Sequence, residues 1–61
     1  MERLNDILAK EQINSNDATY LIKMAKELYN TIIKHGCFCK QSNINKVKES
    51  YLQLQAQANN Q

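Results

Sequence analysis

Apolar residues recur at intervals of three and four through the middle of the chain, which is the spacing of one helical face. Leu21, Ala25, Leu28 and Ile32 lie on that face, and further apolar residues flank it. The resulting sector is too wide for a single neighbouring helix to cover. We therefore expect a central helix over residues 16–35 that packs against more than one other element.

Polar residues and one glycine mark the expected ends of this helix. The run from Asn14 to Asp17 consists of residue types that favour turns and helix caps. If Asn14 is the cap, Asp17 occupies the third helical position, whereas a cap at Ser15 or Asn16 moves the start by one or two residues. Gly36 is the only glycine, and we expect it to end the helix in the left-handed conformation.

Two further amphipathic segments flank the central helix. We expect residues 2–13 to form a short helix with one apolar face, and residues 43–57 to form a helix with a narrow apolar seam. The seam consists of Ile44, Val47, Tyr51, Leu54 and Ala58. The absence of proline favours helices with few irregular joints. The sequence therefore predicts an all-α fold in a single small domain: a short N-terminal helix followed by an antiparallel two-helix hairpin.

The length of the chain predicts that an isolated monomer has only marginal stability. A chain of about 60 residues buries only about 60% of the surface that its unfolded form exposes. Disulfides, metals and oligomerisation are the usual additional supports. Since the central helix has more apolar surface than its two companion helices can cover, we predict self-association into a small helical bundle, as a homodimer or another homo-oligomer.

Charge and composition indicate which partners, which compartment and which source to expect for the protein. Eight basic and six acidic residues give a net charge of +2, which is too balanced to indicate a nucleic-acid or membrane partner by itself. The first residues lack the apolar run of a secretory signal, and no stretch of about 18 apolar residues could cross a membrane. We expect a cytoplasmic protein without a membrane partner, and the Asn-, Lys- and Ile-rich composition is typical of a phage or a low-GC bacterium.

His35, Cys37 and Cys39 are the only clustered residues of the metal-ligating types. Structural zinc sites need four ligands, with more widely spaced cysteine pairs, so one chain cannot complete a site, although two chains each supplying a pair of thiolates could. A Cys37–Cys39 disulfide would close a small strained ring. Reactive thiols favour helix N-termini, and these thiols follow the expected C-terminus of the central helix. We therefore expect reduced thiols, no metal and no cofactor.

No nucleophile, base and orienting group occur together in a pattern typical of catalysis, so we do not expect an enzyme. The favoured function is a small protein-binding regulator or inhibitor that occludes a surface of its target. Tyrosines at the edge of an apolar sector and a phenylalanine in a loop are typical of contact surfaces. The candidate contact residues are Leu21, Leu28, Tyr29, Ile32, Phe38 and Tyr51.

The alternative is a small DNA-binding transcriptional regulator. Lysines cluster around the second loop and the start of the third helix, where they could contact phosphates. These residues are Lys34, Lys40, Lys46 and Lys48. Against this interpretation, the expected loop is longer than the three or four residues of a helix-turn-helix motif, and arginine is almost absent.

Overall fold

The fold is built from three α-helices and one long extended connection. The computed structural model describes residues 2–59, in which α1 is Glu2–Ala9, α2 is Ser15–Tyr29 and α3 is Gln41–Asn59. No strand occurs within these residues, so the predicted all-α class is confirmed. None of the helices in this part of the chain combines the length and apolar character that a bilayer crossing requires.

The start of α2 has the cap that the sequence predicts. Asn14 Oδ1 accepts a hydrogen bond from the Asp17 backbone N–H at 2.8 Å, and Asp17 Oδ2 accepts one from the Asn14 backbone N–H at 3.4 Å. This reciprocal capping box satisfies two backbone donors at the helix end. Lys10 Nζ lies 3.1 Å from Asp17 Oδ2, which joins the connection after α1 to the cap. Ile13 and Ala18, on either side of the cap, are buried.

The first and third helices differ from their predicted lengths. α1 ends at Ala9 rather than at residue 13, and Ile13 packs into the core from the connection instead. α3 is two residues longer at each end than the predicted 43–57. Its seam is confirmed at Ile44, Val47 and Tyr51, which are all buried.

α2 ends six residues earlier than predicted. Tyr29 is its last residue, and Asn30 adopts the left-handed conformation, with φ 51° and ψ 39°, that the sequence predicts for Gly36. The Asn30 backbone N–H donates to the Ala25 carbonyl. Asparagine tolerates this conformation because its short side chain can form local hydrogen bonds, and the β-branched residues that follow lower helix propensity. The prediction of a helix to residue 35 with a glycine cap is therefore wrong.

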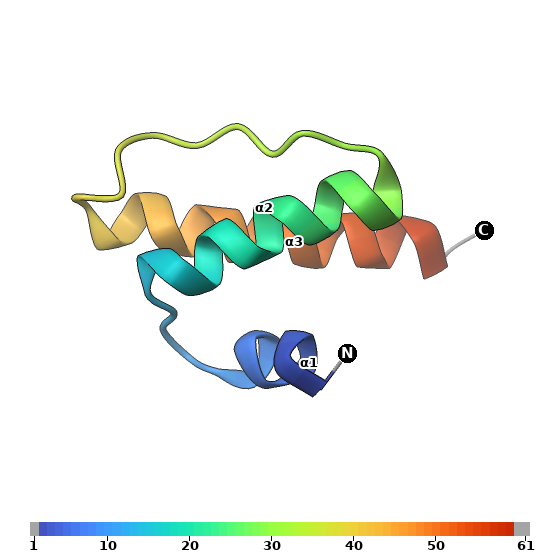
Figure 1. Cartoon of the computed structure of the whole chain (residues 1–61), viewed down its shortest axis with the longest axis horizontal. Helices are drawn as coiled ribbons and strands as arrows, with labels where there is room; N and C mark the ends of the chain where they lie inside the picture. Colours follow the sequence, from blue (N-terminus) through green and yellow to red (C-terminus); the bar gives the residue numbers. More distant parts are fainter. Residues whose placement is uncertain (1, 60–61) are drawn as a thin grey trace.

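The connection from Asn30 to Lys40, here called the strap, runs back along the length of α2 before α3 begins (Figure 1). It brings the start of α3 beside the start of α2, where Gln41 Nε2 donates to the Ile13 carbonyl at 2.8 Å. A helix of 15 residues advances about 22 Å, and an extended chain covers that distance easily at about 3.3 Å per residue. α2 and α3 are therefore parallel, and the predicted antiparallel hairpin is wrong.

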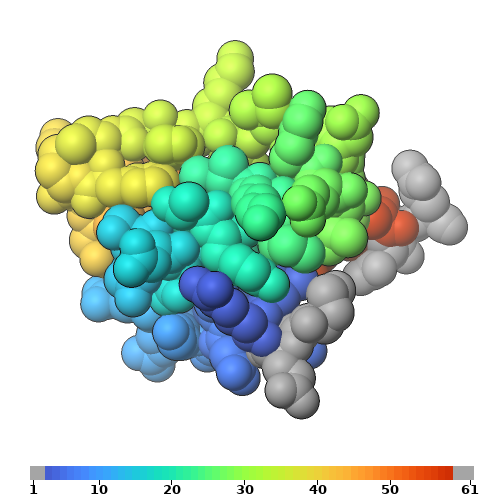
Figure 2. Space-filling model, viewed as in Figure 1, coloured from blue at the N-terminus to red at the C-terminus, as the bar shows by residue number. Residues whose placement is uncertain are grey.

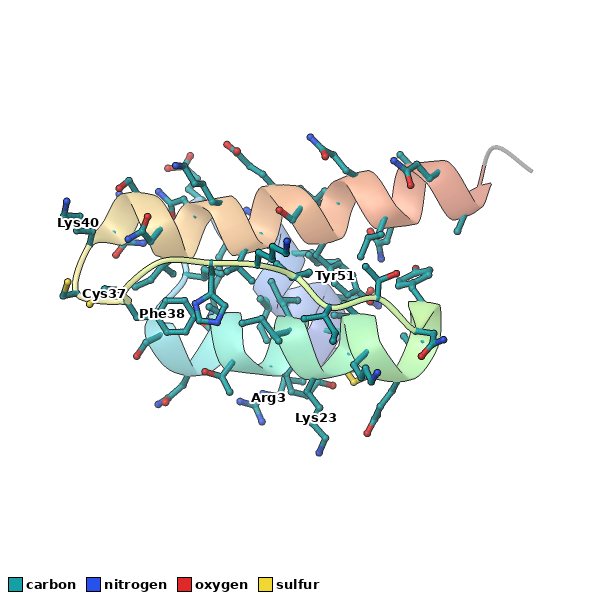
Figure 3. All side chains as sticks on the ribbon, turned by 90° about the horizontal axis from the view of Figure 1, so that it is seen from above. Arg3, Lys23, Cys37, Phe38, Lys40 and Tyr51 are labelled. Atoms are coloured by element: carbon teal, nitrogen blue, oxygen red, sulfur yellow. The ribbon has the colours of Figure 1, made fainter. Side chains whose placement is uncertain are left out.

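α1 and the strap cover opposite sides of the α2–α3 pair (Figures 1 and 3). α1 contributes Leu4 and Ile7 to the core, and the strap contributes Ile33, which is 5% exposed. Between these layers, Leu21 and Ala25 of α2 are completely buried. The strap supplies the cover that the sequence predicts from a second molecule, and the core residues Leu21 and Ala25 of α2 are closed off within one chain. Self-association stays a prediction.

Candidate protein-binding surface

The strap and α3 leave an open groove of about 280 Å³ between them. Ile32 and Leu54 supply apolar lining, Gln53 and Gln57 supply amide donors and acceptors, and Lys34 supplies a positive charge. The strap forms the upper edge of the molecule in the space-filling view (Figure 2). A recess of this composition suits an apolar side chain of another molecule, with amides available for its backbone. Leu54 belongs to the apolar seam that the sequence predicts, but no sequence signal indicates Gln53 and Gln57, because the groove exists only where the strap returns.

Four of the six predicted contact residues keep exposed surface. Ile32 is 71% exposed and Leu28 is 49% exposed, whereas Tyr29 and Phe38 are half-buried against the core. The exposure of Ile32 follows from the extended backbone, in which successive side chains point to opposite sides. Because Ile33 points into the core, Ile32 points away from it.

Leu21 and Tyr51 are completely buried, so neither offers surface to a partner and both leave the predicted contact set. The Tyr29 ring meets the Tyr51 ring edge-on, with centroids 5.8 Å apart and planes at 70°. Among the described residues, the buried Tyr51 hydroxyl has no hydrogen-bond partner. Burial, together with the nearby Tyr29 phenol, raises the pKa of Tyr51 above its ordinary value. Tyr51 is therefore a neutral core residue.

The four predicted DNA-contacting lysines do not all lie on one face. Lys34, Lys40 and Lys46 are exposed, and Lys46 lies one turn before Ser50, which lines the groove. Lys48 is half-buried, and its Nζ donates to the Lys10 carbonyl in the connection after α1. Two residues along a helix correspond to about 200° of rotation, so Lys46 and Lys48 point to different sides. Lys48 therefore does not share a surface with Lys46, and the DNA-binding interpretation stays a prediction.

His35, Cys37 and Cys39 are exposed at the other end of the strap. The His35 ring stacks on Phe38 with centroids 4.5 Å apart, and its Nδ1 lies 2.9 Å from the Gly36 carbonyl oxygen. Within residues 2–59, no group of three His, Cys, Asp or Glu side chains is placed to hold a metal ion. Because α2 ends at Tyr29, the thiols precede the N-terminus of α3 rather than following the C-terminus of α2.

The strap-facing side of the molecule carries two separate features. The groove lies between residues 31–34 and the C-terminal half of α3, and the thiols lie where the strap turns into α3. Neither a family model, nor a curated protein, nor a solved structure matches this chain.

Proposed function

We propose that the chain is a small non-catalytic regulator or inhibitor that docks onto a target protein through the groove and through Ile32. The observation that carries this proposal is the 71% exposure of Ile32 on a strap whose next residue is buried. The buried neighbour fixes the direction of Ile32, so its apolar surface is presented to solvent without freedom to turn inward. Burying an isoleucine side chain completely is worth about 1.5–3 kcal/mol, which makes Ile32 a suitable anchor.

Leu28 and Tyr29 extend this contact surface at the end of α2, close in the chain to the start of the strap. A standard protein interface takes about 800 Å² from each partner, which is roughly a fifth of the 4385 Å² surface of this chain. A contact of that size fits one side of the molecule. Its effect on the target would be to cover a functional surface, which requires no chemistry from the bound chain.

Affinity purification from a host lysate tests the proposal, with the wild-type chain and Ile32→Asp as baits. Leu52→Asp is the matched control. Leu52 is an apolar residue of the same size as Ile32 and is also exposed, at 41%, but it does not line the groove. We expect wild type and Leu52→Asp to retain the same protein and Ile32→Asp to bind it at least about tenfold more weakly. Equal retention by wild type and Ile32→Asp would contradict the proposal.

A second copy of the chain is a further candidate for the same groove, in line with the predicted homo-oligomer. Light scattering over a range of protein concentrations measures this directly. If a dimer uses the groove, Ile32→Asp shifts its dissociation to higher concentration and Leu52→Asp does not. A dimer that both variants leave unchanged would place self-association on another surface.

A further inference from the structure

Cys37 and Cys39 form an exposed dithiol in the turn that leads into α3. The Lys40 backbone N–H donates to the Cys37 carbonyl at 3.4 Å, and Asn43 Nδ2 donates to the same carbonyl at 2.8 Å. The Cys39 backbone N–H donates to the Cys37 sulfur at 3.2 Å. Figure 3 shows Cys37 beside Lys40 at the outer end of the molecule. The pair is accessible to a reagent, while hydrogen bonds hold the backbone that carries it.

The surroundings make the two thiols unequal. The turn lies at the N-terminal, positive end of α3, where negative charge is favoured. The hydrogen bond from the Cys39 thiol lowers the pKa of Cys37, with a further contribution from the Cys39 backbone N–H. The same side-chain interaction raises the pKa of Cys39. The backbone N–H of Cys39 donates to the Cys37 sulfur and so stabilises a thiolate there, which makes Cys37 the attacking thiol of the pair.

We propose that Cys37 and Cys39 form a thiol–disulfide exchange site for an accessible disulfide, R–S–S–R, with Cys37 as the attacking thiol and Cys39 as the resolving thiol. The Cys37 thiolate attacks one sulfur, the S–S bond breaks, and one RS⁻ leaves while the other R–S group stays joined to Cys37. The Cys39 thiolate then attacks the Cys37 sulfur, forms the Cys37–Cys39 disulfide and releases the second RS⁻. The two thiol protons end on the released thiolates, so the dithiol loses two electrons and the disulfide becomes two RSH.

The short spacing of the pair determines what kind of disulfide results. A ring closed between residues two apart is strained, and strained, exposed disulfides are the ones that are most easily reduced. The Cys37–Cys39 bridge is therefore labile and returns to the dithiol under reducing conditions. Such a site takes part in thiol–disulfide exchange with other molecules and does not stabilise the fold as a permanent cross-link.

Mass spectrometry during incubation with oxidised glutathione tests this site, using wild type, Cys37→Ser and Cys39→Ser. We expect wild type to pass through a single adduct to a species that has lost two hydrogens. Cys39→Ser stops at one stable adduct on Cys37, because the resolving thiol is missing. Cys37→Ser forms its adduct roughly three- to tenfold more slowly than Cys39→Ser, because the Cys39 backbone N–H stabilises a thiolate at Cys37 and this hydrogen bond is retained in Cys39→Ser.

The same reactions in concentrated urea provide the control for geometry. In urea the two single variants should react at equal rates, since the unfolded chain no longer holds the Cys37 sulfur against the Cys39 backbone N–H. Circular dichroism should show the folded helical content in all three proteins, because both thiols are exposed. Equal rates for the two variants in the folded state, or a wild-type chain that ends with glutathione on both cysteines, would overturn the proposal.

Discussion

Ile32 and Ile33 are consecutive isoleucines of the strap that differ from 71% to 5% in exposure, so they form a matched pair for testing how the strap packs. Replacing a buried isoleucine by alanine costs about 2–5 kcal/mol, depending on how far the site can collapse. Ile33 enters the core from one outer layer, where neighbours can relax, so we expect Ile33→Ala to cost about 2–3 kcal/mol. Ile32→Ala removes exposed atoms, and we expect a change within about 0.5 kcal/mol.

Urea denaturation followed by circular dichroism measures both variants against wild type. A chain of 61 residues has a free energy of unfolding of roughly 3–9 kcal/mol at typical values per residue. Ile33→Ala should therefore remove a large part of the total, and its transition midpoint should fall well below that of wild type. A loss below about 0.5 kcal/mol for Ile33→Ala, or equal losses for the two variants, would refute the packing described for the strap.

Three other changes have expected outcomes. Tyr51→Phe removes a buried hydroxyl without a partner among the described residues, so the free energy of unfolding should rise by about 1 kcal/mol in urea titrations, and a fall would reveal a hydrogen bond to that hydroxyl. The raised pKa of Tyr51 means that its contribution to stability is complete below the unfolded pKa of about 10 and is lost as pH rises through the higher folded pKa. Denaturation curves should show that alkaline loss in wild type and a smaller one in Tyr51→Phe. Asn14→Ala should cost about 1 kcal/mol by removing the α2 cap, and an unchanged midpoint would show that the cap is dispensable.

Local signals predicted the parts of the fold that local interactions determine. The Asn14 cap depends on residues within one turn, and its capping box is present. The α3 seam depends on helical periodicity alone, and Val47 and Tyr51 are buried as predicted. Local signals do not determine where α2 ends, because Asn30 and Gly36 are both residue types that adopt the left-handed conformation of a helix C-cap. The packing of Ile33 and Phe38 of the strap onto the core is a long-range contact that periodicity does not indicate.

The end of α2 at Tyr29, six residues before the predicted end, also limits what the sequence predicts of the site. With an early cap at Asn30, the chain has enough extended residues to return, and α3 becomes parallel to α2. The sequence predicts Ile32 as a contact residue on a helical face. In the structure Ile32 is exposed for another reason, because it alternates with the buried Ile33 along an extended strap. Periodicity cannot distinguish a core face from a contact face, so it predicts Leu21 as a contact residue although Leu21 is buried. The early end of α2 also changes the charge environment of Cys37. The sequence predicts the thiols after the negative end of a helix, whereas they lie before the positive end of α3.

Nuclear Overhauser effects from α3 to residues at the two ends of α2 test the central claim most directly, because the parallel arrangement creates both the groove and the position of the thiols. The structure predicts cross-peaks between the Gln41 side-chain amide and Ile13, and between the Tyr29 and Tyr51 rings. An antiparallel hairpin would place the start of α3 beside the end of α2. Cross-peaks between Gln41 and Tyr29, with none between Gln41 and Ile13, would contradict the parallel arrangement and the interaction surface built on it.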